Sequence, residues 1–363
     1  MEFYIFLVIV LSLLVTLVKP FIPEARYALS SSLVGTNLYF FGGLGSGDND
    51  SLSTQTFYLD VSKPFSIDNI PWTLSSSQIP IGISFAQTFV GGKSKNKIFL
   101  YGGQRKNLTD FSLNYDNIMY SFDTKSQSWS QLTINGMPSL RRKMQIPVDD
   151  AGEAFLFGGQ DENYVLKDMN LFDTTKLSWK LNISSDDFTT PNPRSDYSST
   201  ILKNGMIVYI GGWEIKDNNI PGYVDMNQIF IFDTKSSQWG ETIATGDHIG
   251  NRRGHQAVLI QDDKILIYGG TTNGGVDNQT LISATPVLAI LDTKNLNFRW
   301  SIPQTFETLA KSPPPLLYFT SNVIGDYMIV TFGNITNSIS NPSETSSNLY
   351  LLNTKNFTWV NTF

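Results

Sequence analysis

The sequence predicts an all-β fold: a six-bladed β-propeller of four-stranded antiparallel blades, preceded by an N-terminal hydrophobic segment. Three observations predict it. Short runs of β-branched and aromatic residues end at glycines six times along the 363 residues, and six of the seven tryptophans recur at one place after those glycines. The repeats are 53 to 64 residues long and contain only short strands and turns, which is the sequence pattern of a propeller.

The chain begins with an almost wholly apolar run over Phe3–Val18. Its length lies between a signal-peptide core and a membrane span, so it predicts a secretory signal peptide, with an uncleaved anchor as the alternative. No Lys or Arg precedes the run, while Lys19 and Arg26 follow it, as in a reversed anchor. We therefore expect residues 1–23 to be a signal peptide or signal anchor and residues 24–363 to be the propeller of a secreted or secretory-pathway protein.

Potential N-glycosylation sites are compatible with this location. An N-x-S/T sequon accepts a glycan only where it is exposed to the secretory pathway. The chain is rich in Asn, Ser and Thr, so the sequons agree with a secreted glycoprotein without demonstrating one. They begin at Asn49, Asn107, Asn182, Asn278, Asn334 and Asn356.

Each repeat divides into strands A, B, C and D. Strand B is a continuous apolar run, as expected of a strand covered on both faces by neighbouring blades. Glycine ends it, an Asp-Thr-Lys-like turn follows strand C, and a tryptophan opens strand D and packs between blades. The first glycines of the six stops are Gly42, Gly102, Gly158, Gly211, Gly269 and Gly333, the last followed by Asn334 in place of a second glycine.

One further strand is expected before each glycine stop. These A strands are β-branched or polar and complete four strands per blade. They are expected over Ala28–Val34, Ser84–Val90, Met144–Val148, Ser198–Leu202, Gln256–Ile260 and Tyr318–Val323.

The landmarks resemble those of Kelch repeats over about residues 24–363. Arg194-Ser195-Asp196-Tyr197 and Arg252-Arg253-Gly254-His255 also resemble the opening of strand A in that family. The resemblance implies a propeller of antiparallel blades. Because the chain opens on an A strand and ends after a D strand, we expect six self-contained blades, with blade 6 packed on blade 1. The alternative is a strand within Phe21–Glu24 that exchanges into blade 6.

The B–C and D–A connections emerge on one face of such a propeller, and binding is usually carried by loops on a rigid scaffold. The D–A junctions there carry Arg26, Arg141, Arg142, Arg194, Arg252 and Arg253. These arginines either bind nearby carbonyls or form a basic funnel for an anionic partner. Trp213 and Tyr223 lie in one of the longer B–C loops, where Trp213 either stacks on a ligand or folds back over the rim. The candidate binding residues are Arg142, Arg194, Arg252, Arg253, Trp213 and Tyr223.

Composition excludes several chemistries. There is no Cys and there are only two His, so thiolate chemistry is excluded, and no metal or other cofactor is expected. Copper enzymes of the galactose-oxidase type, which have related propellers, need a cysteine-crosslinked tyrosine that this chain lacks. The net charge of −6 argues against nucleic acid as a partner. Contact with a membrane is expected only through the anchor.

These patterns predict a non-enzymatic module that binds a protein or a glycan, with anionic groups as the expected chemistry. The alternative is a metal-independent isomerase or hydrolase acting on an anionic sugar, because a fold does not determine a function. The two hypotheses differ in the expected site. An enzyme needs a deep channel with converging acids and arginines, whereas a binding module can use a broad face.

Overall fold

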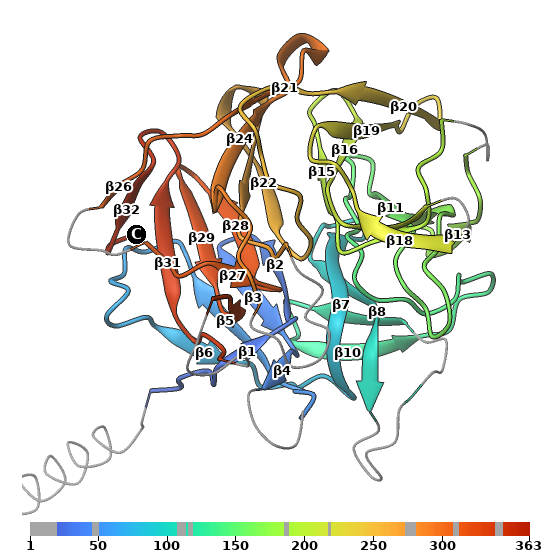
Figure 1. The fold of residues 1–363 in the computed structure, drawn as a ribbon. Helices are drawn as coiled ribbons and strands as arrows, with labels where there is room; N and C mark the ends of the chain where they lie inside the picture. Colours follow the sequence, from blue (N-terminus) through green and yellow to red (C-terminus); the bar gives the residue numbers. More distant parts are fainter. Residues whose placement is uncertain are drawn as a thin grey trace, which may run out of the picture.

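The computed structural model describes residues 20–45, 51–106, 114, 119–184, 189–216, 219–272, 281–307, 312–337 and 344–363. These residues form six blade sheets arranged around a central axis, with the N-terminal and C-terminal blades side by side, and three smaller sheets (Figure 1). The described residues contain no α-helix, only two 3-10 turns at Gln261–Asp263 and Lys294–Leu296. The predicted six-bladed propeller is confirmed.

Each blade consists of consecutive strands paired antiparallel, from A on the inside to D on the outside. Blade 1 contains β2 (Ser30–Val34), β3 (Asn37–Phe41), β5 (Thr56–Asp60) and β6 (Trp72–Leu74); blade 2 contains β7 (Gly82–Gly91), β8 (Lys97–Lys106), β9 (Met119–Asp123) and β10 (Ser128–Leu132); blade 3 contains β11 (Glu153–Phe157), β12 (Met169–Asp173) and β13 (Ser178–Lys180). Blade 4 contains β15 (Ser198–Ile201), β16 (Met206–Ile210), β19 (Gln228–Asp233) and β20 (Gln238–Ile243); blade 5 contains β22 (Gln256–Ile260), β23 (Lys264–Tyr268), β24 (Leu288–Asp292) and β25 (Arg299–Ser301); blade 6 contains β28 (Thr320–Ile324), β29 (Tyr327–Thr331), β31 (Leu349–Asn353) and β32 (Thr358–Val360).

Two blades gain a fifth strand at the outer edge. The connection leaving blade 4 forms β21 (Thr245–Gly246), which pairs parallel with β25 of blade 5. The connection leaving blade 5 likewise forms β26 (Phe306–Glu307), parallel to β32 of blade 6. Both short strands cover an edge whose N–H and C=O groups would otherwise face solvent.

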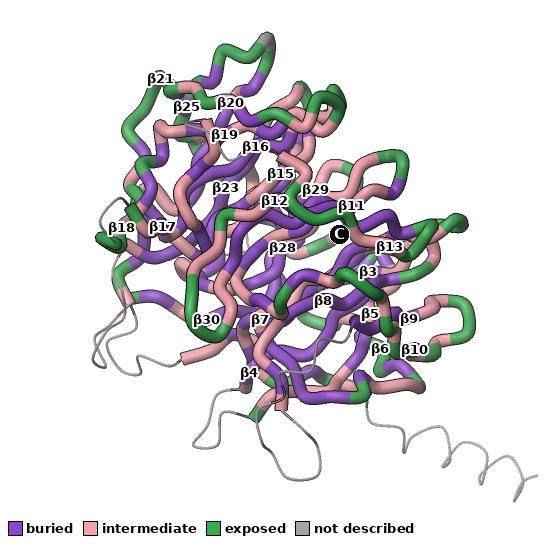
Figure 2. The backbone as a smooth tube through the Cα atoms, turned by 90° about the vertical axis from the view of Figure 1, so that its right-hand side faces the viewer, coloured by how far each residue is buried: buried purple, intermediate pink, exposed green. Residues whose placement is uncertain are grey.

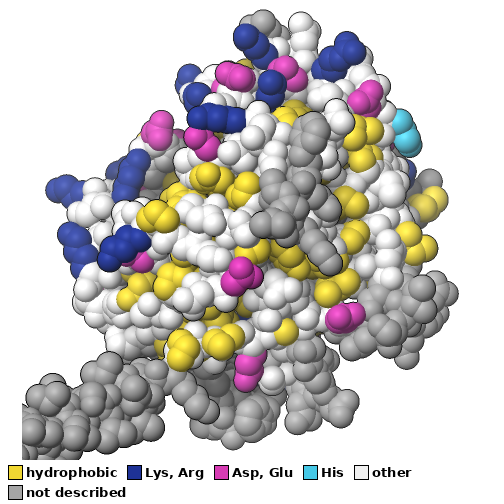
Figure 3. Space-filling model, turned by 90° about the vertical axis from the view of Figure 1, so that its left-hand side faces the viewer, with side chains coloured by type: hydrophobic (Ala, Val, Ile, Leu, Met, Phe, Trp, Pro, Cys, Tyr) yellow, Lys and Arg dark blue, Asp and Glu magenta, His cyan; other side chains and the backbone are white. Residues whose placement is uncertain are grey.

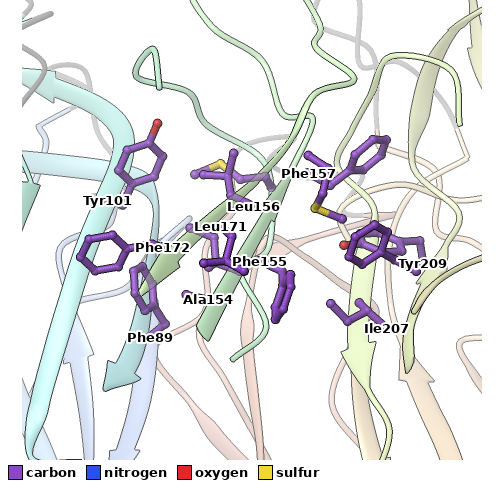
Figure 4. Packing of buried hydrophobic residues seen from close by; sticks show 14 of the residues in the cluster. Phe89, Tyr101, Ala154, Phe155, Leu156, Phe157, Leu171, Phe172, Ile207 and Tyr209 are labelled. Atoms are coloured by element: carbon purple, nitrogen blue, oxygen red, sulfur yellow. The ribbon is translucent and has the colours of Figure 1, made fainter. Parts of the chain in front are cut away.

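The core lies between the blades. The B strands are buried along most of their length, and turns at both ends of the blades are exposed (Figure 2). Figure 4 shows two such layers: Phe89 and Tyr101 of blade 2 face Phe172 of blade 3, and Phe155 and Phe157 on the other side of blade 3 face Tyr209 and its neighbours in blade 4. Strand B is apolar on both faces because both faces meet another blade.

The recurring tryptophans pack onto the preceding blade, as predicted. Trp239 of blade 4 lies 4.7 Å from Phe157 of blade 3, measured between ring centroids. Trp300 of blade 5 is 1% exposed and donates its indole N–H to the Met226 carbonyl of blade 4 at 3.0 Å. Trp129 and Trp179 follow the same pattern but remain partly exposed.

The predicted A strand over Met144–Val148 is wrong. Blade 3 has three strands, and the segment contributes only a bridge between Val148 and Ala154 and a hydrogen bond from Phe155 N–H to the Pro147 carbonyl at 2.9 Å. Pro147 has no N–H to donate, so the ladder is interrupted where the strand would be.

The sixth glycine stop is also shifted by one residue from the predicted alignment. Gly333 takes the place of the second glycine, because its N–H donates to the next blade as those of the other second glycines do. Phe332 takes the place of the first glycine, with a left-handed φ of 62°. Its ring fills the junction between blades 6 and 1, with centroids 5.8 Å from both Phe40 and Phe57.

The ring closes without exchange of a strand, as predicted. The second glycine of every blade donates its N–H to a carbonyl of the following blade at 2.8–2.9 Å, and Gly333 completes the circle by bonding the Arg26 carbonyl of blade 1. Phe21 packs on Phe57 at 5.6 Å, and residues 20–25 form no strand.

The C-terminal residues add a second contact between blades 6 and 1. Phe363 stacks on Phe65 with ring centroids 5.1 Å apart, and its N–H donates to the Phe65 carbonyl at 3.0 Å. Phe65 belongs to the long connection between β5 and β6. The long connection of blade 1, which departs from the repeat pattern, therefore provides the contact for the C-terminal residue Phe363.

Within the described residues, no helix is long and apolar enough to span a bilayer. The apolar run Phe3–Val18 lies outside those residues, so the signal or anchor, the boundary at residue 24 and the secretory location stay predictions.

Replacing Phe332 tests the closure. Phe332→Ala is expected to lower the free energy of unfolding by ~3–5 kcal/mol through loss of the buried ring. Phe332→Gly loses the same ring but relieves ~1–2 kcal/mol of left-handed strain, so it is expected to be the milder variant. Urea unfolding followed by circular dichroism measures both.

The matched control is Leu296→Ala, at another left-handed position (φ 59°) that is 48% exposed and outside the core. It is expected to change stability by less than ~0.5 kcal/mol. A loss for Phe332→Gly as large as that for Phe332→Ala would contradict the strain argument.

Candidate functional site

The D–A and B–C segments build a second tier of short sheets on one face. In blade 1, β1 (Arg26–Tyr27) pairs with β4 (Leu44–Gly45); in blade 4, β14 (Arg194–Ser195) pairs with β17 (Trp213–Lys216), which pairs with β18 (Ile220–Tyr223); in blade 6, β27 (Leu316–Leu317) pairs with β30 (Asn334–Ile335). Blade 2 extends β7 and β8 through the same tier, and blades 3 and 5 have bridges there. The expected binding face is therefore an ordered platform.

A ring of left-handed residues, which we call the neck, separates this tier from the A strands. One residue per blade has φ between 53° and 64°: Ala28, Phe85, Lys143, Asp196, Gly254 and Tyr318. Five of these six residues donate their backbone N–H to the carbonyl of the neck residue in the preceding blade, at 2.8–3.1 Å. Each left-handed residue acts as a bulge that turns the chain from the upper tier into strand A.

The arginines before the neck are mostly structural. Arg26, Arg141 and Arg252 each donate to the carbonyl of the first glycine of their own blade, at 3.0–3.3 Å, and to the carbonyl two residues earlier. Arg141 also pairs with Asp168 at 2.6 Å, and Arg194 with Glu214 at 3.3 Å. The interpretation as carbonyl ligands fits Arg26, Arg141 and Arg252, whereas Arg194 bonds the Glu214 carboxylate; all four are 0–3% exposed.

Blades 2 and 6 have Ile83 and Leu316 where the other four blades have arginine, and blade 2 obtains the same contact differently. Arg105, at the end of β8, donates to the Gly102 carbonyl at 3.0 Å and is 2% exposed. Sequence reasoning missed this residue because it lies in a B–C segment and not at a D–A junction.

The two remaining arginines lie at the channel mouth. Arg253 lies over the ring of Trp213 at 5.2 Å, and Trp213 makes an edge contact with Tyr223 at 5.0 Å. Arg142 belongs to blade 3 and is half-buried. Of the six predicted site residues, the structure brings Arg253, Trp213 and Tyr223 together with Arg142 nearby, whereas Arg194 and Arg252 lie inside the fold.

Four neck residues that were not among the predicted site residues complete the site: Phe85, Lys143, Asp196 and Tyr318. The Lys143 ammonium lies 5.7 Å from the Phe85 ring, and Phe85 meets Tyr318 edge to face at 4.9 Å. Tyr318 donates its hydroxyl to Asp196 at 2.6 Å. For Lys143 and Asp196 the available sequence pattern was the position two residues after a D–A arginine, whereas Phe85 and Tyr318 belong to the two blades without one. We define the mouth surface as Arg142, Lys143, Trp213, Tyr223 and Arg253, over a floor of Phe85, Asp196 and Tyr318.

The charges of the mouth surface are unbalanced. Burial lowers the pKa of Lys143; Asp196 opposes this shift, and Arg142 and Arg253 add to it. Burial raises the pKa of Tyr318, and the Asp196 carboxylate raises it further, so this hydroxyl stays a neutral donor at pH 7. Among the residues that define the mouth surface and its floor, three are cations and one is a carboxylate, which is already engaged by Tyr318 and by Ser195 at 2.9 Å; Asp161 and Glu162 line an adjoining pocket with Arg142.

Comparison with known proteins agrees with this geometry. Residues 28–270 and 217–362 match the model of the KLHDC2/KLHL20/DRC7 Kelch-repeats domain. The chain belongs to the Kelch-repeat family.

Several relatives share the Kelch propeller over parts of their length. Acyl-CoA-binding domain-containing protein 5 of Arabidopsis thaliana is 23% identical over 322 residues, which is 86% of this chain and 44% of the relative. Kelch domain-containing protein 3 of Bos taurus is 25% identical over 253 residues (65% and 62%). N-(sulfonatooxy)prop-2-enimidothioate sulfolyase of Thlaspi arvense is 24% identical over 176 residues (48% and 49%). The chain spans less than half of the length of its two Arabidopsis acyl-CoA-binding relatives.

The fold also matches a solved structure. The structure of YjhT superimposes with a TM-score of 0.67 over 94% of this chain and 98% of that chain, at 14% sequence identity. This likeness supports the Kelch propeller fold.

The arginines of this Kelch propeller do not converge on the axis. The guanidinium groups of Arg26, Arg141 and Arg252 bind carbonyls of their own blades. No group of three or more His, Asp or Glu side chains that could hold a metal exists in the described part of the chain. None of the described residues that line the channel cavity below the neck is charged.

Charges are also mixed elsewhere. The side drawn in Figure 3 shows Lys and Arg interspersed with Asp and Glu, with hydrophobic side chains scattered between them. Nucleic acids need an extended basic footprint, and this side has none among the residues shown in colour.

Arg252 and Arg253 are adjacent in the sequence but differ in burial, so they test the assignment of the buried arginines as structural residues. Arg252→Ala leaves three carbonyls without their donor, those of Gly250, Gly269 and Pro286, and is expected to cost ~2–4 kcal/mol of stability. Arg253→Ala is expected to cost less than ~1 kcal/mol because the residue is half-buried at the mouth. Equal losses in urea unfolding would refute the division between structural and surface arginines.

His255 gives the stability a pH dependence. Burial, with a smaller contribution from Arg252, lowers the pKa of His255 from 6.5 to about 3. The folded state therefore holds it neutral, and its contribution to stability is complete above pH ~6.5 and is lost as pH falls towards the folded pKa. The stability difference between the parent and His255→Gln is expected to shrink by roughly 2 kcal/mol between pH 7 and pH 4.5.

Urea unfolding at the two pH values measures this change. His248→Gln, at an exposed position, serves as the control and is expected to follow the parent at both. A stability difference for His255→Gln that does not change with pH would contradict the assignment of a buried neutral imidazole.

Proposed function

We propose that this Kelch propeller is a non-enzymatic interaction module that binds an acidic segment of a protein partner at the mouth surface. The observation that supports this most directly is the grouping of Arg142 and Arg253 close enough to Lys143 to lower its pKa, with Asp196 as the carboxylate that opposes them. An acidic side chain or chain terminus can bind arginine through paired, charge-assisted hydrogen bonds.

The aromatic residues supply the second component. Trp213 and Tyr223 are partly exposed and rigidly placed, since β17 and β18 form a paired hairpin and the Arg253 guanidinium covers one ring. Tryptophan, tyrosine and arginine are the residue types that dominate binding energy in protein interfaces. A glycan with acidic groups offers the same chemistry, with stacking of sugar rings on Trp213, and is the alternative partner.

A metal-independent enzyme acting on an anionic sugar remains the alternative function. The sulfolyase similarity favours an enzyme, whereas the neutral channel and the structural arginines favour a binding module. The fold itself is consistent with a binding role. We further propose a secreted or secretory location from the apolar run Phe3–Val18.

Selection from a displayed library of random peptides tests the mouth surface. We expect enriched peptides to be acidic, and Arg142→Ala with Arg253→Ala to weaken the affinity for a selected peptide at least ~10-fold, as loss of two charge-assisted contacts requires. Fluorescence anisotropy measures the affinity at low and high salt.

Arg299→Ala is the matched control, because Arg299 is exposed on β25 away from the mouth. It is expected to leave the affinity unchanged. Selected peptides that bind the double variant as tightly as the parent would overturn the proposed site.

A further inference from the structure

A second compartment lies below the neck, in the central channel. It is a solvent-open cavity of about 210 Å³, lined by the A strands of five blades and by the non-strand segment Gln145–Pro147 of blade 3. Its polar lining consists of carboxamides and hydroxyls, among them Gln87, Gln145, Gln256 and Asn322, and none of the described residues that line it is charged.

Hydrogen bonds between blades hold this lining in place. Gln145 donates to the Gln256 side chain at 3.0 Å, and its oxygen accepts from the Ser199 N–H at 2.6 Å. Gln256 donates in turn to the Phe319 carbonyl at 3.0 Å. On the opposite wall, Ser31 donates to Asn322 at 2.7 Å. These bonds immobilise the amides, so a ligand would meet a preorganised wall.

Other polar groups of the lining have unused hydrogen-bonding capacity. The hydroxyls of Ser199 and Ser321 are shielded and have no hydrogen-bond partner among the described residues. Gln87 uses one amide N–H on the Thr88 carbonyl at 3.0 Å, which leaves its oxygen for another donor. Shielded polar groups usually have partners, so these groups require water or a ligand.

The neck separates this cavity from the mouth surface. The backbone ring narrows the passage, and the side chains of Phe85, Lys143, Asp196 and Tyr318 lie at that level. Lys143 and Asp196 line the neck together with Gln87, Gln145 and Gln256, which also line the cavity. Arg142 and Arg253 line neither space, so a ligand in the cavity would contact neither of these two cations.

We propose that the channel cavity binds a small uncharged polyhydroxylated molecule, a polyol or monosaccharide of about six carbons. A hydroxyl both donates and accepts, so it can pair with amide oxygens, amide N–H groups and serine hydroxyls alike. An ionised ligand would lose hydration without gaining a counter-charge, and an apolar one would leave Ser199 and Ser321 unpaired. The volume equals that of about seven waters in the liquid, enough for such a molecule.

Thermal unfolding in the presence of uncharged monosaccharides and inositol tests the proposal. Excluded solutes raise the melting temperature of any protein in proportion to concentration, so sucrose serves as the control for that effect. We expect one of the small polyols to give an additional, saturable rise, and saturation-transfer NMR to detect its binding directly.

Ser199→Ala combined with Ser321→Ala removes only hydroxyls that have no partner in the protein, so the variant is expected to fold. It should weaken the saturable binding at least ~10-fold, as loss of two hydrogen bonds predicts. Ser130→Ala, an exposed serine on β10, and Arg253→Ala should leave it unchanged. The proposal is overturned if no small polyol shows saturable binding, or if binding persists unchanged in the double serine variant.

Discussion

One backbone hydrogen bond, repeated six times, holds the Kelch ring together: the N–H of the second glycine of each blade donates to a carbonyl of the next. The first glycine makes this approach possible. A Cβ on Gly102 would lie 2.1 Å from the Arg141 oxygen, and one on Gly42 would lie 2.5 Å from the Ile83 oxygen. The glycines therefore do more than end a strand, because they let two blades meet main chain to main chain.

This close approach also explains the arginines. Packing backbone against backbone buries the first glycine's own carbonyl, which then needs a donor from the same blade. Arg26, Arg141 and Arg252 supply it from the D–A side, and Arg105 supplies it from strand B. Because four arginines are used in this way, the number of basic residues near the axis overstates the positive charge that a partner would meet.

The sequence predicted the blades because their packing repeats, and it failed where one residue breaks the local rule. Periodicity located the glycines, the tryptophans and most strands. It did not show that Pro147 removes a ladder donor, nor that Phe332 would occupy a glycine position and fill the closing junction. The candidate site could be predicted less well from the sequence than the blades. Arg252 and Arg253 are neighbours in one motif, yet Arg252 is buried and Arg253 reaches the mouth, a difference that the sequence pattern does not reveal.

The neck shows how one scaffold can carry different functions. Its ring is held by main-chain hydrogen bonds, which any residue except proline can donate, so its side chains are free to differ between blades. Here they range from glycine to tyrosine and include one cation and one carboxylate: Ala28, Phe85, Lys143, Asp196, Gly254 and Tyr318. These positions lie between the mouth and the channel, so their side chains line the passage between the two. The frame sets the left-handed φ at each of them, whereas the side chain that it carries differs from blade to blade.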